Sequence, residues 1–279
     1  MLFGVHVAPS ARTLDIREVG RLAEAAGFES LFLPEHTHMP AYGASVHPSG
    51  EPMRERLSGF LDPFTALAAV AAVTERLRLG TGVCLITQHD PITLAKTCST
   101  LDLLSRGRLI LGVGAGWNRE ELANHGTEPR RRWALMRERV LALKQIWTEE
   151  PAEFHGDLVD FGPILQGPKP VQRPHPPVLI GGEGPRVLER VLDYGDGWGP
   201  NAEPGIPERI GELQRLAHER GKEPIPVTAF HVPPALEQIR RYAEAGTDRC
   251  VFTLPEAGRD EVEAALDRLR RLVTRAQAG

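Results

Sequence analysis

The sequence predicts an α/β protein built as a single (β/α)8 TIM barrel. Short apolar runs alternate with longer helical patterns along all 279 residues. That alternation gives eight strand–helix units, and strands separated by helices form parallel sheets. A chain of this length matches one such barrel, so residues 1–279 are expected to form one domain. An open doubly wound sheet is the alternative, but no GxGxxG motif follows the first apolar run.

Each unit carries its own signals. After Asp15, apolar residues recur at i, i+3 and i+4 until Gly27, which predicts a helix. Asp62 and Asp90 are each followed by proline, the pattern of an N-cap with proline in the first helical turn. Strands are expected at residues 2–7, 30–34, 77–85, 108–113, 177–180, 196–199, 225–232 and 249–254. The remaining helices are expected at residues 63–75, 91–106, 130–147, 185–194, 207–220, 235–245 and 259–275.

Two connections are longer than ordinary barrel turns, and such loops often bind or cover ligands. Residues 37–61 follow a strand, so they belong to the C-terminal face, where barrel active sites lie. Residues 150–176 precede a strand, so they would have to climb over the barrel to reach that face. Five side chains of the first loop are candidates either for an apolar pocket or for loop packing: Met39, Tyr42, His47, Met53 and Phe60.

The composition argues against several classes of partner. The hydrophobic fraction is 41%, the charged fraction 25% and the net charge −4, with no long basic run, so no nucleic-acid partner is expected. No apolar run reaches the ~18 residues that span a bilayer, and the N-terminus does not look like a signal peptide. Cys84, Cys98 and Cys250 form no CxxC pair, which is typical of buried thiols in a reducing compartment. We therefore expect a cytoplasmic protein without membrane contact.

Three glycine-bearing segments could hold a ligand. In residues 181–184 (GGEG), glycines precede Pro185, a plausible first helical residue, so helix N–H groups would face an anion such as phosphate; a tight turn is the alternative. In residues 112–118 (GVGAGWN), a planar ligand could lie on the backbone, or Asn118 could simply cap a helix. In residues 80–83 (GTGV), glycine could admit a ligand or make room for a bulky barrel neighbour.

Glu35 and His36 follow the second strand and are candidate acid–base groups; a polar loop with solvated histidines is the alternative. The spacing of His36 and His38 also raises a metal-hydrolase hypothesis. The last strand ends in Leu-Pro-Glu rather than in an aspartate, so no metal is expected. His89 and His231 are expected to be structural, and the run 130–132 (RRR) a solvated helix start.

Taken together and in order, these segments resemble the luciferase-like monooxygenase family, especially its deazaflavin (coenzyme F420)-dependent branch. The resemblance covers nearly the whole chain. It rests on residues 79–83 (LGTGV), 90–96 (DPITLAK), 100–108 (TLDLLSRGR), 112–117 (GVGAGW), 154–156 (FHG), 168–172 (PKPVQ), 180–182 (IGG) and 195–198 (GDGW).

The resemblance implies a luciferase-like TIM barrel, usually dimeric, with its coenzyme at the C-terminal mouth. The ring would lie across the third and fourth strands, and a non-prolyl cis peptide would buttress it at Gly82–Val83. The family's acid–histidine pair maps to Glu35 and His36, where Glu35 departs from the more common aspartate. The implied coenzyme-binding residues are Gly82, Val83, Ala115, Gly116 and, for the phosphate, Gly181, Gly182, Glu183 and Gly184.

The resulting hypothesis is an enzyme that transfers a hydride between coenzyme F420 and a small organic substrate, with His36 moving the accompanying proton. One alternative is an FMN-dependent monooxygenase that uses oxygen. A second is a deazaflavin-binding protein without turnover, and a third is the metal hydrolase. A homodimer is expected from the resemblance alone.

Overall fold

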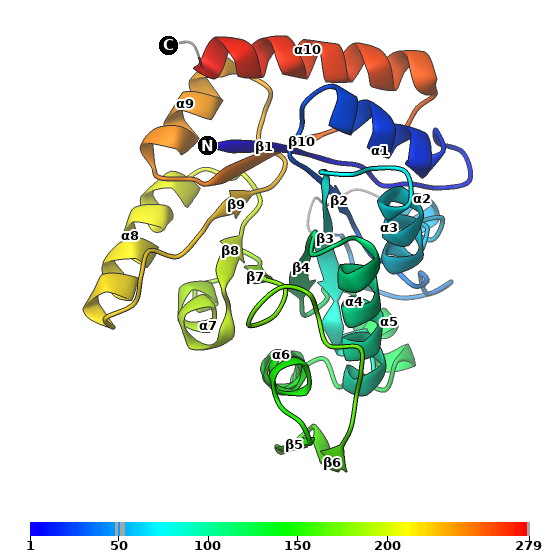
Figure 1. The fold of residues 1–279 in the computed structure, drawn as a ribbon, viewed down its shortest axis with the longest axis vertical. Coiled ribbons are helices and arrows are strands. Elements are labelled where there is room, and N and C mark those ends of the chain that lie inside the picture. Colours follow the sequence, from blue (N-terminus) through cyan, green and yellow to red (C-terminus); the bar gives the residue numbers. More distant parts are fainter. Residues whose placement is uncertain (48–49, 51–53, 278–279) are drawn as a thin grey trace.

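Eight parallel strands form one sheet that curls into a nearly closed barrel, in a computed structural model that describes residues 1–47, 50 and 54–277 (Figure 1). The strand order is β8-β7-β4-β3-β2-β1-β10-β9. Parallel bridges Trp198–Val227 and Asn201–Phe230 join the two outer strands and close the ring. The strands are β1 (Leu2–His6), β2 (Ser30–Leu33), β3 (Arg78–Leu85), β4 (Leu109–Gly114), β7 (Val178–Gly181), β8 (Gly197–Gly199), β9 (Thr228–Ala229) and β10 (Arg249–Thr253). The predicted TIM barrel is confirmed.

Helices surround the strands, and the predicted caps start three of them. The carboxylates of Asp15, Asp62 and Asp90 accept hydrogen bonds from the first turns that follow them. The barrel helices are α1 (Ile16–Ala25), α3 (Pro63–Ala71), α4 (Pro91–Leu104), α6 (Arg132–Thr148), α7 (Val187–Tyr194), α8 (Ile206–Glu219), α9 (Leu236–Glu244) and α10 (Arg259–Gln277). The shorter helices are α2 (Arg54–Leu57), α5 (Arg119–Asn124) and the 3-10 turn η1 (Ile86–Gln88). Within the described ranges, no helix is both long and apolar enough to cross a membrane.

The lumen of the barrel is filled by a small apolar cluster of its own, made of Phe32, Ile110, Leu179, Phe230 and Val251. The rings of Phe32 and Phe230 meet edge to face, with centroids 5.0 Å apart. A Cβ atom at Gly80 would lie 2.2 Å from the Phe32 ring. Gly80 therefore makes room for a bulky barrel neighbour, which confirms the structural alternative for that glycine.

The expected strand at residues 225–232 is wrong in length. Only Thr228 and Ala229 pair regularly there, and single bridges extend the contact at Val227 and Phe230. Pro226 has no N–H group to give to a ladder, and His231 has a φ of +56°, outside the extended region. These two residues shorten the strand from both ends.

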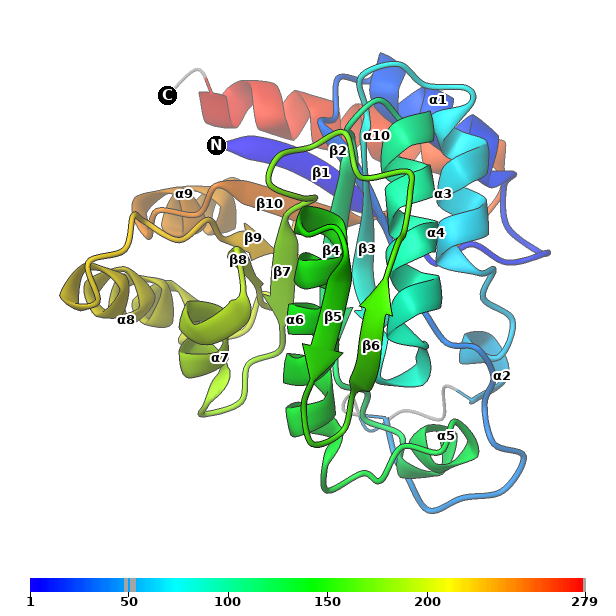
Figure 2. The same cartoon turned by 60° about the horizontal axis from the view of Figure 1, so that its bottom comes forward.

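The long connection at 150–176 contains an antiparallel hairpin that the sequence analysis does not predict. Strands β5 (Ala152–His155) and β6 (Asp160–Ile164) lie against α6, on the outside of the barrel (Figure 2). Phe154 and Phe161 pack on a small cluster that includes Leu135 and Val159. The hairpin therefore covers a helix and contributes no residue to the cavity described below.

The lumen packing gives a direct stability test. Gly80→Ala places a methyl group in the Phe32 ring, and such overpacking is expected to lower the free energy of unfolding by about 1–3 kcal/mol. The matched control is Gly211→Ala, because Gly211 lies in α8 and a Cβ atom added there would have no other atom within 4 Å. That change is expected to raise the free energy of unfolding by about 0.5–1 kcal/mol. Urea denaturation measures both, and equal effects would contradict the packing argument.

Candidate active site

A cavity of about 640 Å³ opens at the C-terminal ends of the strands, the face where TIM barrels hold their active sites. Its size is within the usual range for small-molecule and cofactor sites. The ten residues that the sequence analysis proposes for catalysis or coenzyme binding all line it: Glu35, His36, Gly82, Val83, Ala115, Gly116, Gly181, Gly182, Glu183 and Gly184. They come from the ends of β2, β3, β4 and β7, so the barrel brings together segments far apart in the chain.

One wall of the cavity is bare backbone. The Gly82–Val83 peptide bond is cis, as the resemblance implied. A Cβ atom at Gly82 would lie 2.9 Å from the Phe230 ring, and one at Gly114 would lie 2.7 Å from the Val83 side chain. Neither position has space for a larger side chain, so the ends of β3 and β4 keep a surface on which a flat ligand can rest.

The glycine-rich loop after β7 is held in place by side chains that donate hydrogen bonds to its carbonyl oxygens. The Trp198 indole N–H donates to the Gly182 oxygen at 3.0 Å, and the Arg209 guanidinium donates to the oxygens of Glu183 and Gly184. In the part of the chain that the structure describes, the N–H groups of Gly184 and Arg186 have no acceptor. Because α7 starts directly after them, the loop presents donors and a helix N-terminus to an anion.

Glu183 is the one acidic side chain in this loop. Its Oε1 atom accepts a hydrogen bond from the Asn201 N–H at 2.6 Å. Burial raises the pKa of Glu183, and the negative charge of Glu203 raises it further. A partly buried carboxylate beside an anion site weakens that site when it is ionised, so Glu183 is better suited to holding the loop than to touching a phosphate.

His36 points into the cavity and is oriented by a carboxylate that the sequence analysis missed. Its Nδ1 atom lies 3.0 and 3.1 Å from the two oxygens of Glu121, which is 1% exposed. Glu121 stands in the first turn of α5, which Asn118 caps by accepting the Glu121 N–H. With Nδ1 bound to a carboxylate, Nε2 is the nitrogen available to a ligand. The sequence analysis gave Asn118 as a possible helix cap, but that pattern does not indicate a contact between Glu121 and His36.

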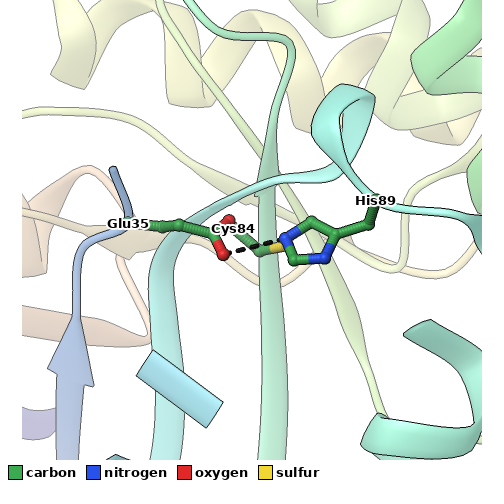
Figure 3. Close-up of side chains that lie close together, drawn as sticks. All are labelled: Glu35, Cys84 and His89. Carbon is green, nitrogen blue, oxygen red and sulfur yellow. Dashed lines mark hydrogen bonds and ion pairs between the residues drawn. The ribbon is translucent and has the colours of Figure 1, made fainter. Parts of the chain in front are cut away.

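Glu35 faces away from His36 and ties the end of β2 to the end of β3. Its carboxylate accepts the Leu85 N–H at 2.6 Å and lies 2.8 Å from His89 Nε2, while Cys84 stands beside it (Figure 3). His89 is therefore a structural partner, as expected. A role for Glu35 in catalysis stays a prediction. Both of its carboxylate oxygens already bind groups of the protein, the Leu85 N–H and His89.

His36 and His38, whose spacing raised the metal-hydrolase hypothesis, do not come together as metal ligands. His36 bonds to Glu121, and His38 contacts Thr37 and Asn124. Across residues 1–47, 50 and 54–277, the group close enough to share an ion is instead Glu35, Cys84 and His89. Burial and the Glu35 charge raise the pKa of the Cys84 thiol well above its usual range. In this group Glu35 and His89 are hydrogen-bonded to each other, with Cys84 beside them.

Two further histidines line the cavity, and the sequence analysis did not assign them there. His6 ends β1, and its ring meets that of His231 edge to face at 4.7 Å. His6 is 6% exposed, and neither ring nitrogen reaches a hydrogen-bond partner among the described residues. Burial, followed by the nearby charge on His231, lowers the pKa of His6 to about 3. Its imidazole is therefore neutral at physiological pH.

The loop at 37–61 supplies part of the remaining wall. His47 and Phe60 line the cavity, and the ring centroids of Phe60 and Trp117 lie 6.2 and 5.9 Å from that of His36. Tyr42 is 91% exposed, and Met39 is half-buried outside the cavity lining. Met53 lies outside the described residues.

Comparison with known proteins identifies one family over nearly the whole chain. The model of the luciferase-like monooxygenase family matches residues 2–278. An uncharacterized protein of Mycobacterium tuberculosis is 39% identical over 96% of this chain and 97% of its own.

Characterised relatives differ in their coenzymes. An F420-dependent glucose-6-phosphate dehydrogenase of Intrasporangium calvum is 31% identical over 63% of this chain and 50% of its own. An FMNH(2)-dependent dimethylsulfone monooxygenase of Pseudomonas putida is 29% identical over 81% and 60%. Among solved structures, the coenzyme F420-dependent tetrahydromethanopterin reductase of Methanopyrus kandleri shares the fold, with a TM-score of 0.77, 17% identity and 98% coverage of both chains.

The contact made by Glu35 can be tested through stability. Glu35→Ala leaves the buried Leu85 N–H without an acceptor and is expected to lower the free energy of unfolding by about 2 kcal/mol. Glu35→Gln keeps an acceptor there and should lose less than half as much. Glu128→Ala, a change at an exposed acid, serves as the control and should stay within about 0.5 kcal/mol of the wild type. An equally small effect at Glu35 would contradict the structural role.

His6 predicts a loss of stability in acid. The unfolded chain takes up a proton near pH 6.5, whereas folded His6 does so only near pH 3, so stability falls as the pH drops through this window. Between pH 7 and pH 5 the wild type is expected to lose about 2 kcal/mol that His6→Leu does not lose. Denaturation at the two pH values measures this difference. The exposed control His218→Gln should follow the wild type, and parallel curves for His6→Leu would exclude a buried neutral His6.

Proposed function

Because the chain belongs to the luciferase-like monooxygenase family, we propose that it is an oxidoreductase that holds coenzyme F420 in this cavity. It transfers a hydride between that coenzyme and a small organic substrate. The observation that carries the proposal is His36, which faces the cavity beside a bare backbone wall and is oriented by a buried carboxylate.

The residues present fit a coenzyme with a flat ring and an anionic side chain. Gly82, Val83 and Gly114 leave a backbone surface at the ends of β3 and β4 that a ring can cover. The Gly181–Gly184 loop offers free N–H groups to a phosphate at the start of α7. The 31% identical relative that depends on F420 supports this choice of coenzyme.

His36 would manage the proton that accompanies hydride transfer. A deazaflavin, when bound, supplies or accepts the hydride and does not readily activate oxygen. Nε2 of His36 would give a proton to the substrate heteroatom when the substrate is reduced, and take it back in the reverse direction. Glu121 holds the ring through Nδ1 and balances the positive charge of the protonated imidazole. Phe60 and Trp117 narrow the space around His36 and limit the access of water.

The second candidate is an FMN-dependent monooxygenase, which the relative from Pseudomonas putida favours. The same wall and the same loop would accept the ring and phosphate of FMN. Reduced FMN reacts with oxygen, so oxygen consumption separates the two activities. The homodimer and the cytoplasmic location implied earlier stay predictions.

The first experiment is a fluorescence titration of the purified protein with coenzyme F420 and, separately, with FMN. Tight binding of F420 alone supports the proposal and directs a substrate screen with the reduced coenzyme. Tight binding of FMN alone overturns it in favour of the monooxygenase. F420 binding without redox exchange against any donor or acceptor would indicate a binding protein without turnover.

His36→Asn tests the proton transfer itself. Because general acid–base catalysis contributes about 10²–10⁴-fold, turnover with F420 should fall by about that factor while the Kd for the coenzyme stays within about twofold. His218→Asn, at an exposed position on α8, should change neither quantity. Unchanged turnover in His36→Asn would remove His36 from the mechanism.

A further inference from the structure

Two arginines lie against Trp133 at the edge of the cavity, and a third stands at the start of α7, beside the glycine-rich loop. Trp133 lies in the first turn of α6 and lines the cavity together with Arg132. The guanidinium carbon of Arg190 lies 3.9 Å from the centre of the Trp133 ring, and that of Arg132 lies 5.3 Å from it. Arg186 stands just before α7, one turn from Arg190. Arg132, Arg186 and Arg190 are called the arginine cluster below.

The positive charges of the arginine cluster are not balanced by the protein. Within the described part of the chain, none of the three arginines forms an ion pair with an acidic side chain within 4 Å. The Nε atom of Arg132 is buried and has no hydrogen-bond partner there. Burial lowers the pKa of Arg190 and the charges on Arg186 and Arg132 lower it further, while Tyr194 and Glu189 act in the opposite direction. Three guanidinium groups that repel one another favour an anionic ligand between them.

The position of the cluster indicates which part of a ligand it would meet. Helices α6 and α7 are neighbours, and the Gly181–Gly184 loop leads directly into α7 (Figure 1). A phosphate on the loop N–H groups would therefore lie next to Arg186. The rest of the ligand beyond that phosphate would continue toward the start of α6, where Arg132 and Trp133 line the cavity and Arg190 reaches the Trp133 ring from α7.

We propose that the arginine cluster binds the anionic tail that follows the phosphate of coenzyme F420. FMN ends at its phosphate, whereas F420 continues through a lactyl group into a chain of γ-linked glutamates that carry carboxylates. Guanidinium groups pair with carboxylates through paired N–H donors, so this cluster suits such a tail. The inference rests on the proposed F420 function. It also corrects the expectation that residues 130–132 are only a solvated helix start, because Arg132 lines the cavity.

The test compares three ligands that differ only in the tail: the deazaflavin without phosphate, F420 with phosphate but no glutamate, and F420 with several glutamates. Binding is followed by fluorescence. We expect the polyglutamate form to bind the wild type about tenfold more tightly than the form without glutamate, an advantage that shrinks at high salt. In Arg132→Gln/Arg186→Gln the advantage should fall below about twofold, because the polyglutamate form loses more affinity than the form without glutamate.

The control variant is Arg268→Gln/Arg271→Gln, which removes the same charge from exposed positions on α10 and should keep the full advantage. If the double variant loses stability, Arg186→Gln alone, at an exposed position before α7, provides the test. Equal affinity of the wild type for the two phosphate-bearing forms would overturn the tail site and leave the proposed function standing. An equal loss for both forms in the variant would assign the arginines to the phosphate instead. If no deazaflavin binds, the proposed function fails and this inference fails with it.

Discussion

The packing of Phe32 against Phe230 across the barrel lumen is the constraint on which the rest of the site depends. Eight strands leave an interior that side chains must fill, and two large rings fill it only because β3 has a glycine at position 80. The rings close the floor below the cavity, so the space above them opens toward the loops. At the upper ends of β3 and β4, Phe230 crowds Gly82 and the Val83 side chain crowds Gly114, which leaves a backbone wall there. The Phe230 ring therefore takes part both in the filled lumen and in the wall of the open mouth.

The two buried carboxylates at the mouth of the barrel, Glu35 and Glu121, have different roles because their hydrogen-bond partners differ. Glu35 is surrounded by groups of the protein, since the Leu85 N–H and His89 occupy its oxygens, so it joins strand ends. Glu121 is fixed by the cap of its own helix and reaches one histidine, whose second nitrogen faces the cavity. Neighbouring positions in the sequence, Glu35 and His36, thus belong to separate hydrogen-bonded groups. The geometry proposed for proton transfer comes from a pair of residues on different strand–loop units.

Much of the fold was predictable because it depends on local signals. The caps at Asp15, Asp62 and Asp90 and the alternation of apolar runs fix eight units, and their number fixes the barrel. The lining of the cavity was also predictable, since strand ends of a parallel barrel converge. The pairing of His36 with Glu121 was not, because a contact between residues 85 positions apart depends on side-chain direction at two separate loops. The hairpin at 152–164 and the shortened β9 escaped prediction for a related reason: both depend on what the segment packs against.

The three cysteine thiols of this protein are expected to react slowly. Cys84, Cys98 and Cys250 are all buried, and burial raises the pKa of each above its usual value. Since thiolates are the species that react with maleimides and oxidants, the native cysteines are poor targets for both reagents. A single cysteine introduced at Tyr42, which is almost fully exposed in the loop beside the mouth, would then be modified selectively. The protein can accept a spectroscopic label next to its cavity without any of its own cysteines being replaced.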